Sequence, residues 1–331
     1  MAELPLENLT VPTSNSTAEE VVNTFAAEVK GKNVLVTGTS LGGLGFETSR
    51  AIARYANMVI ITGHNDERLK LSETAIKKDN PTAKIYPLLI DLTSLASVRK
   101  AAEEVNKLAE PIHVLINNAA VGLIPFKLTS DGLELHWSTN HVGPFLFTNL
   151  IMPKILASAS PTYTPRVVFV SSVAHANPGD PVNLDALTNP DPTKYSPPVA
   201  YRDTKAANIL TALELFKRAK GKVNTYSLHP GLIYTNAFEK DGTLPIFQGA
   251  GVLDENGKPI LSKSIPWKSI GQGAATTVTA AFDPSLNDKP GAYLEDCQVA
   301  NDKVAPHASD PETARKLWDV TEKLVGESFA F

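Results

Sequence analysis

Residues 33–45 read Asn-Val-Leu-Val-Thr-Gly-Thr-Ser-Leu-Gly-Gly-Leu-Gly, so a short apolar run leads into a cluster of glycines. The apolar run predicts a buried strand, and residues 44–55 after it predict a helix. Glycines at such a junction let backbone N–H groups approach a pyrophosphate, which the positive end of the helix also attracts. Because glycine-rich turns also serve simply to reverse a chain, the stretch alone leaves nucleotide binding and a structural turn both open.

The same alternation of apolar runs and helix-length segments continues along the chain. Nearly continuous apolar runs are typical of strands buried on both faces of a parallel sheet, and they occupy residues 33–37, 58–62, 84–90, 113–116, 166–171, 223–228 and, more briefly, 292–294. Helices are predicted between them at residues 44–55, 66–77, 94–108, 131–157 (with an irregular middle) and 199–219. The pattern predicts an α/β fold, a single Rossmann-type doubly wound parallel sheet of about seven strands flanked by helices on both faces.

Three segments fall outside this rhythm. Residues 1–30 are predicted to be an N-terminal extension with a helix at 17–29, and residues 31–331 a single catalytic domain. Residues 176–198 carry six prolines, which argue for a long loop without regular structure. Residues 236–270 are rich in Gly, Pro and Lys, and we expect them to form a lid. Both segments are predicted to be substrate loops.

Composition excludes several classes of function. The 331 residues carry a formal net charge of −4, so no general basic field favours nucleic acid. No stretch approaches 18 apolar residues, which argues against a membrane span, and the first residues do not resemble a secretory signal. The single cysteine and these absences favour a cytoplasmic location. The seven histidines show no metal-ligand spacing, so no metal site is predicted, and a monomer and a homo-oligomer both remain open.

Several short motifs follow the predicted strands in a fixed order. They are Thr37-Gly38 with Gly43-Leu44-Gly45, Asp91-Leu92, Asn117-Asn118-Ala119-Ala120, Ser171-Ser172, Tyr201 with Lys205, and Pro230-Gly231. Together they resemble the short-chain dehydrogenase/reductase family over about residues 16–325. The first turn has one residue more than that family's Thr-Gly-x-x-x-Gly-x-Gly pattern, with Leu41 or Gly42 as the insertion, and Ala120 stands where the family has glycine.

Tyr201 and Lys205 lie one helical turn apart in the predicted helix, so their side chains share a face. Reduction of a carbonyl needs a proton delivered to oxygen, and a nearby ammonium should lower the pKa of the tyrosine toward the working pH. The resemblance implies that Tyr201 donates this proton, that Ser172 supports the carbonyl oxygen, and that Lys205 binds the nicotinamide ribose. It also implies that Asn140 holds a water linked to Lys205. Ser171 competes with Ser172 for the serine role.

The resemblance further implies an NAD(P)(H) site. The residues expected to contact the cofactor are Gly38, Thr39, Ser40, Leu41, Gly43, Leu44, Gly45, His64, Arg68, Asp91, Leu92, Asn118, Ala119, Ala120, Tyr201, Lys205, Pro230, Gly231, Ile233 and Thr235. Gly63 occupies the position where NAD-specific members carry an acid, and His64 follows it, which favours NADP(H) while leaving NAD(H) possible. Asp66 and Glu67 would favour NAD(H) if they faced the ribose.

Details such as Asn140-His-Val-Gly-Pro-Phe145 and Ser172-Val-Ala-His175 are similar to the branch of retinol dehydrogenases and the WW-domain oxidoreductase. The implied function is an oxidoreductase that interconverts a ketone or aldehyde, expected to be lipophilic, and its alcohol. One alternative is a catalytically silent nucleotide-binding regulator of the same fold. Another is an epimerase or dehydratase of the extended branch, although the Gly-x-x-Gly-x-x-Gly turn of that branch is absent here.

Overall fold

The computed structural model describes residues 11–179, 181–235, 238, 243–249, 251–262 and 266–331. Within them, eight strands form the main sheet in the order β10-β9-β6-β5-β4-β1-β2-β3, and β10 alone pairs antiparallel. The strands are β1 Asn33–Val36, β2 Met58–Gly63, β3 Ile85–Leu89, β4 Val114–Asn117, β5 Arg166–Val170, β6 Asn224–His229, β9 Tyr293–Glu295 and β10 Gln298–Val299. The predicted Rossmann-type sheet is confirmed, with one short edge strand more than expected.

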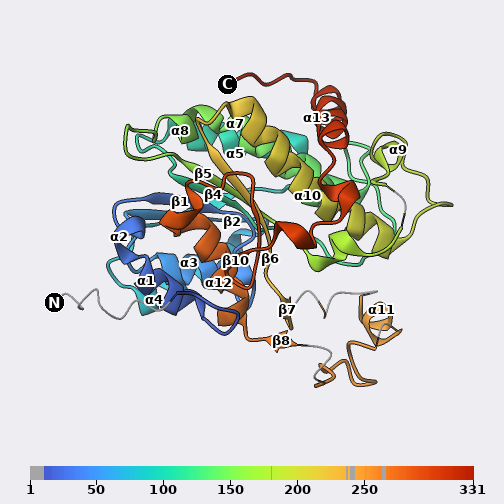
Figure 1. Ribbon diagram of the computed structural model, residues 1–331, viewed down its shortest axis with the longest axis horizontal. Coiled ribbons are helices and arrows are strands. Elements are labelled where there is room, and N and C mark those ends of the chain that lie inside the picture. Colours follow the sequence, from blue (N-terminus) through green and yellow to red (C-terminus); the bar gives the residue numbers. More distant parts are fainter. Residues whose placement is uncertain (1–10, 180, 236–237, 239–242, 250, 263–265) are drawn as a thin grey trace.

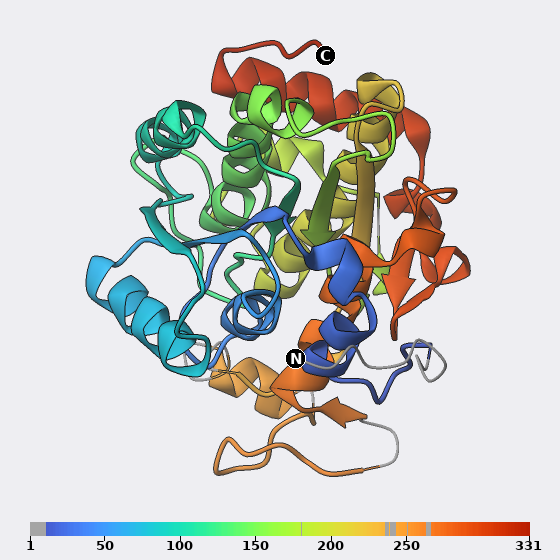
Figure 2. The ribbon, with the colours of Figure 1, turned by 90° about the vertical axis from the view of Figure 1, so that its left-hand side faces the viewer.

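Helices cover both faces of this sheet (Figures 1 and 2). The helices on one face are α1 Ala18–Thr24, α2 Ala26–Val29, α3 Leu44–Ile52, α4 Asp66–Asp79 and α12 Ile270–Phe282. The helices on the other face are α5 Leu95–Lys107, α7 Gly143–Leu150, α8 Met152–Leu156, α10 Pro197–Ala219 and α13 Pro311–Val325. None of the helices in the described part of the chain is long and apolar enough to cross a bilayer.

The inner strands β1, β2, β4, β5 and β6 are buried on both faces, so alternate residues enter two different cores. In β1, Leu35 packs with the core under α5, α7 and α10, whereas Val34 and Val36 pack with the core under α3 and α12. A parallel strand buried in this way is mostly apolar on both faces, which is why the periodicity of two is absent from the sequence. Polar residues are therefore concentrated just beyond the carboxyl ends of the strands.

The order 3-2-1-4-5-6 reverses direction between β1 and β4. In open α/β sheets, ligands bind beyond the carboxyl ends of the strands at such a switch point. The glycine-rich turn follows β1 there, and the Asn117-Asn118 pair stands at the end of β4. The fold thus brings these two motifs side by side although some 80 residues separate them.

Two predicted segments differ from the structure. The predicted helix at 131–157 is divided into α6 Leu135–Trp137, a π-helical turn η2 Ser138–Val142, α7 and α8. The predicted loop at 176–198 contains the helix α9 Leu184–Thr188, and α10 begins at Pro197 rather than at 199. The expectation that proline excludes regular structure is wrong at this point because proline fits the first turn of a helix, where its missing N–H would have no partner.

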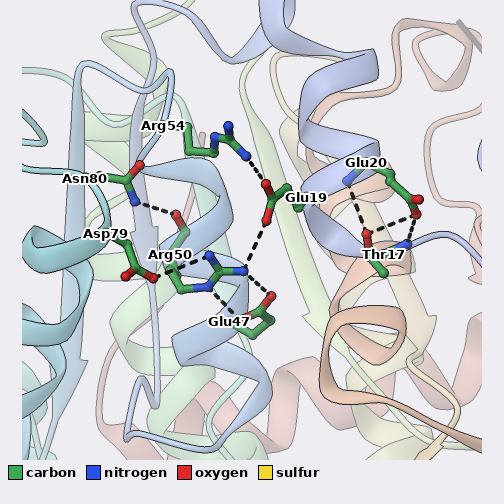
Figure 3. Close-up of polar contacts among 8 residues, drawn as sticks. All are labelled: Thr17, Glu19, Glu20, Glu47, Arg50, Arg54, Asp79 and Asn80. Carbon is green, nitrogen blue, oxygen red and sulfur yellow. Dashed lines mark hydrogen bonds and ion pairs between the residues drawn. The ribbon is translucent and has the colours of Figure 1, made fainter.

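The N-terminal segment is docked by a capping box and ion pairs (Figure 3). Thr17 accepts a hydrogen bond from the backbone N–H of Glu20, whose carboxylate accepts one from the backbone N–H of Thr17. Glu19 lies between Arg50 of α3 and Arg54, just beyond the end of that helix, and pairs with both. Residues of α1 share the apolar core of α3 and α12. The extension is thereby fixed to the helix that follows the glycine-rich turn.

The segment after β6 stands apart from the main sheet (Figure 1). Strand β7 Leu232–Ile233 pairs with β8 Trp267–Lys268, and the short helix α11 Leu244–Gly249 lies between them in the chain. Phe238 is buried and packs its ring against those of Tyr234, Phe247 and Trp267. Residues 236–237, 239–242, 250 and 263–265 of the predicted loop, and residue 180 of the other, lie outside the described residues. Whether 236–270 acts as a lid stays a prediction.

Candidate active site

Two glycines allow the turn after β1 to touch the end of β4. A Cβ atom on Gly38 would lie 2.7 Å from the Cα of Ala119, and Gly38 has φ = +71°. A Cβ atom on Gly45 would lie 2.4 Å from both the Asn118 side-chain nitrogen and the Gly38 carbonyl oxygen. Neither position accepts a side chain without movement of the backbone, so both glycines are required by packing as well as by any ligand.

Hydrogen bonds fix the same contact. The Asn118 side chain donates to the carbonyl oxygens of Thr37 and Gly38 at 2.8 and 3.1 Å. The Thr37 hydroxyl accepts from the backbone N–H groups of Asn118 and Ala119, both at 3.0 Å. Asn117 is turned the other way and donates to Thr148. Asn118 thus ties the two predicted cofactor motifs into one rigid edge.

The extra residue of the turn is absorbed in residues 40–43. The N–H of Gly43 donates to the carbonyl of Ser40 at 3.1 Å, and Gly42 has φ = +74°. Leu41 and Ser40 are exposed, and Gly43 caps α3 through its extended backbone before Leu44 begins the helix. The first backbone N–H groups of α3 therefore face the carboxyl edge of the sheet, as a pyrophosphate site requires.

A small pocket opens at the end of β2 beside this turn. Its walls are Ser40, Thr62, Gly63, His64, Asn65, Arg68 and Leu69. His64 and Arg68 are exposed there, whereas Asp66 pairs with Lys70 and does not line the pocket, nor does Glu67. Thr39 is buried, and its hydroxyl donates to the Thr62 carbonyl at 3.1 Å, so it supports the pocket rather than opening into it.

The remaining predicted cofactor residues border the same edge. The Asp91 carboxylate accepts from the N–H and hydroxyl of Thr93, whereas the N-cap of α5 is Ser94. Leu92 is buried against α7, where a Cβ atom on Gly143 would lie 2.5 Å from its carbonyl oxygen. Ala120 is exposed beyond β4.

Pro230 to Thr235 follow β6 and rest on α12. The stem of Lys268 lies over Gly231, whose φ is +101°, and the Lys268 ammonium pairs with Asp296. Ile233 packs so closely on Gly273 that a Cβ atom there would lie 2.5 Å from its Cγ1. The Pro-Gly turn is therefore held by α12 and β8, and Gly273 of α12 also lies against Leu44, where α3 begins after the glycine-rich turn.

The two adjacent serines after β5 have different surroundings. The Ser171 hydroxyl is buried and donates to the carbonyl oxygen of Lys205 at 2.7 Å. The Ser172 hydroxyl accepts from the N–H of Ala174 at 3.2 Å and lies near enough to the Tyr201 phenol to lower its pKa. Of the two serines considered from the sequence, Ser172 is the one that meets the tyrosine.

Tyr201 and Lys205 lie in the first turns of α10 on one face, as their spacing predicts. The Lys205 ammonium lies 5.6 Å from the centre of the Tyr201 ring and donates to the Val170 carbonyl at 2.9 Å. Lys205 is buried and has no acidic partner within hydrogen-bond reach among the described residues, so its charge faces the end of β5.

Asn140 is linked to Tyr201 through Thr204. Its side-chain nitrogen donates to the Thr204 hydroxyl and to the Val121 carbonyl, and its oxygen accepts from the N–H of Val121. The Thr204 hydroxyl in turn donates to the Tyr201 carbonyl at 2.9 Å. Asn140 thus joins the chain after β4 to the start of α10, and the water that it is expected to hold stays a prediction.

Burial dominates the electrostatics of this group. It raises the pKa of the Tyr201 phenol, and the hydrogen bond with Ser172 opposes that rise. It lowers the pKa of Lys205 to about 8. From the sequence we expected the ammonium to lower the pKa of the phenol, but desolvation is the larger effect in the protein alone. At neutral pH, Tyr201 therefore holds its proton.

Comparison with known proteins shows which family the chain belongs to. The family model described as short chain dehydrogenase matches residues 32–183. The chain is 36% identical to short-chain dehydrogenase TIC 32 A, chloroplastic, of Brassica napus, over 94% of this chain and 93% of that one. It is 33% identical to bovine retinol dehydrogenase 12, over 89% and 87% of the two chains, and 32% identical to the human WW domain-containing oxidoreductase, over 97% and 75%.

The chain belongs to the short-chain dehydrogenase/reductase family. Its resemblance to the retinol dehydrogenase and WW-domain oxidoreductase branch is confirmed by these relatives. A crystal structure of an uncharacterised protein from Mycobacterium paratuberculosis has the same fold, with a TM-score of 0.69 and 27% identity over 92% of this chain and 98% of that one. Members of this family are nicotinamide-dependent oxidoreductases.

One buried network in this short-chain dehydrogenase/reductase went unrecognised in the sequence. Glu134 caps α6 with one carboxylate oxygen and lies 3.0 Å from His136 Nδ1 with the other. The His136 ring also contacts the Gly122 carbonyl and the Tyr195 hydroxyl, and it lies 6.4 Å from the Tyr201 ring. The network joins residues 122–136 to Tyr195, which lies just before α10 and Tyr201. No spacing rule identifies it, because its members come from three separate segments.

We expect Gly45→Ala to disrupt the turn. The new methyl would overlap the Asn118 side chain and the Gly38 carbonyl, each 2.4 Å away. The free energy of unfolding, measured in urea, should fall by about 2 kcal/mol. Gly249→Ala is the control, because no atom lies within 4 Å of that position. Equal stability of the two variants would contradict the close contact.

The low pKa of Lys205 predicts a pH dependence of stability. The unfolded chain keeps the lysine proton up to about pH 10.5 and the folded chain only to about 8. Between these values the unfolded state binds more protons, so the free energy of unfolding gains a contribution that rises with pH, by about 3 kcal/mol over the window. Lys205→Met should remove this rise and Lys78→Met, an exposed site on α4, should not. Parallel urea-unfolding profiles for all three proteins would refute the assignment.

Proposed function

We propose that this protein is an NADP(H)-preferring carbonyl reductase or alcohol dehydrogenase that acts on a small, lipophilic ketone or aldehyde and its alcohol. The observation that carries the proposal is the placement of the Ser172 side chain beside the Tyr201 phenol, with the buried Lys205 ammonium 5.6 Å from the centre of that ring. All three stand at the carboxyl edge of the sheet, next to the glycine-rich turn. A phenol that keeps its proton, beside a second hydroxyl, suits protonation of a carbonyl oxygen.

The residues of this edge fit a nicotinamide dinucleotide. The turn at 38–45 offers backbone N–H groups at the start of α3 and excludes side chains at Gly38 and Gly45. The pocket with His64 and Arg68 would hold the adenosine ribose, and the Pro230-Gly231 segment would border the nicotinamide. When bound, the cofactor supplies or accepts a hydride.

The protein's own residues account for the proton. Tyr201 would donate it to the carbonyl oxygen, and Ser172 would donate a hydrogen bond to the same oxygen as negative charge develops. Lys205 would hold the nicotinamide ribose and stabilise the phenolate left on Tyr201, because its ammonium lies near the ring. The Ser171 hydroxyl donates to the backbone carbonyl of Lys205, so the position of Lys205 is coupled to that of the serine pair after β5.

We also propose a cytoplasmic location, on the single cysteine of the sequence. The description of the Brassica relative as chloroplastic makes this worth testing. Imaging of the full chain with a C-terminal fluorescent fusion would decide it, and accumulation in an organelle would overturn the location without affecting the proposed reaction.

Tyr201→Phe should abolish turnover while sparing the cofactor site. The ring stays in place, but the proton donor is lost, so reduction of a panel of aldehydes should fall by about 10²- to 10⁴-fold. The Kd for NADPH, measured by fluorescence, should change little. Tyr163→Phe is the control, since that hydroxyl bonds the His113 carbonyl at the opposite edge of the sheet. Near-native turnover of Tyr201→Phe would refute the proposed chemistry, and a wild type without turnover would favour a silent nucleotide-binding protein.

The cofactor preference is predicted to depend on Arg68 and His64. Wild-type kcat/KM should be higher with NADPH than with NADH, because both side chains line the pocket where a 2′-phosphate would lie and neither Asp66 nor Glu67 does. Arg68→Ala should reduce the ratio about tenfold, the scale of one charged hydrogen bond. Lys70→Ala, which removes a neighbouring cation paired with Asp66, should leave the ratio unchanged. Equal ratios in wild type and Arg68→Ala would show that this pocket does not bind phosphate.

A further inference from the structure

His175 is a buried histidine with no part in the proposed chemistry. It lies in the single-turn helix η3 Val173–Ala176, which follows Ser172 directly, and is only 1% exposed. Its Nδ1 atom lies 2.6 Å from the carbonyl oxygen of Ser172. A side chain thus closes the short turn that carries the Ser172 hydroxyl.

This hydrogen bond determines the tautomer of the ring. A carbonyl oxygen only accepts, so Nδ1 carries the hydrogen atom. Burial lowers the pKa of His175, opposed by the carbonyls of Ser172 and Lys303 and by Glu295, while His307 acts with burial. The ring is therefore neutral, and Nε2 has no hydrogen-bond partner among the described residues. The hydrogen bond to Ser172 is the directional contact that this side chain makes.

His175 is itself held from the C-terminal part of the chain. The His307 side chain, in the helical turn η7 Pro306–Ala308, donates to the His175 carbonyl at 2.8 Å. The Tyr293 ring of β9 packs against the imidazole, with ring centres 5.1 Å apart and an interplanar angle of 61°. His175 therefore connects the turn after β5 with β9 through its ring and with η7 through its backbone carbonyl.

We propose that His175 is a positioning residue that orients Ser172 toward Tyr201. The proposal rests on the proposed function, because it concerns the serine of that reaction. Three hydrogen bonds define the turn: the Ala174 N–H donates to the Ser172 hydroxyl, and both the backbone N–H of His175, at 3.1 Å, and its Nδ1 atom donate to the Ser172 carbonyl. Loss of the side-chain bond leaves that carbonyl held by the backbone N–H alone. The Ser172 peptide can then tilt about this remaining bond, and the hydroxyl moves off the line between Tyr201 and a substrate oxygen.

A matched pair of substitutions isolates this hydrogen bond. Asparagine at 175 keeps an N–H donor at nearly the position of Nδ1, whereas leucine has almost the same shape and no donor. His175→Leu should lower kcat about tenfold or more, with the KM for NADPH unchanged. His175→Asn should retain kcat within about threefold. If the leucine variant does not fold, His175→Phe keeps the ring and its contact with Tyr293 and takes its place against asparagine.

A double-mutant cycle with Ser172→Ala separates positioning from general damage. If His175 acts through Ser172, His175→Leu should have no further effect on kcat once the hydroxyl is absent. Equal loss of kcat in the leucine and asparagine variants, or full additivity with Ser172→Ala, would overturn the positioning role. Wild-type turnover of Ser172→Ala would instead overturn the role of serine in the proposed function. The two failures are therefore distinguishable.

Discussion

The contact between the glycine-rich turn and the end of β4 is the constraint on which the rest of the site depends. Gly45 and Gly38 approach Asn118 and Ala119 so closely that no Cβ atom fits, and the Asn118 side chain bridges the gap. This contact fixes the start of α3 relative to the end of β4. Because β4 also pairs with β5, the turn, the Asn118 motif and Ser172 are placed in a single frame.

α10 carries the reactive side chains into that frame. Three hydrogen bonds join this helix to the sheet. The Ser171 hydroxyl donates to the backbone carbonyl of Lys205, and the side chains of Lys205 and Asn208 donate to the Val170 carbonyl. These hydrogen bonds are made at the end of β5, where the carbonyl of its last residue, Val170, accepts from side chains of α10. Lys205 thus uses part of its hydrogen-bonding capacity to position the helix. Desolvation there lowers its pKa, so the charge that would support a phenolate is held at an energetic cost.

Sequence patterns predicted the parts of the structure that depend on local chemistry. The apolar runs gave the strands from β1 to β6 and β9, because strands buried on both faces are apolar throughout. Helix α12 was not predicted because it is buried nearly all round and lacks an amphipathic pattern. Helix α13 was not predicted either, although its buried residues recur at helical spacing, because it lies after the last strand of the alternating pattern. β10 is two residues long and exposed, so its composition carries no strand signal. The interruption at η2 was expected only as an irregularity, since a π-helical turn has no composition of its own.

The two serines of the site likewise differ in surroundings that the local sequence does not show. Ser171 and Ser172 are chemically identical neighbours, and only the alternation of side chains along an extended backbone assigns them to opposite tasks. Ser171 points under α10 and satisfies a carbonyl there, so a hydroxyl at that position serves the fold. Ser172 lies beyond the end of β5, and the turn that follows it is closed by a hydrogen bond from the His175 side chain to the Ser172 carbonyl. The turn that carries the Ser172 hydroxyl is thus held by residues as distant as His307, which donates to the His175 carbonyl, and residues 166–172 alone do not reveal this contact.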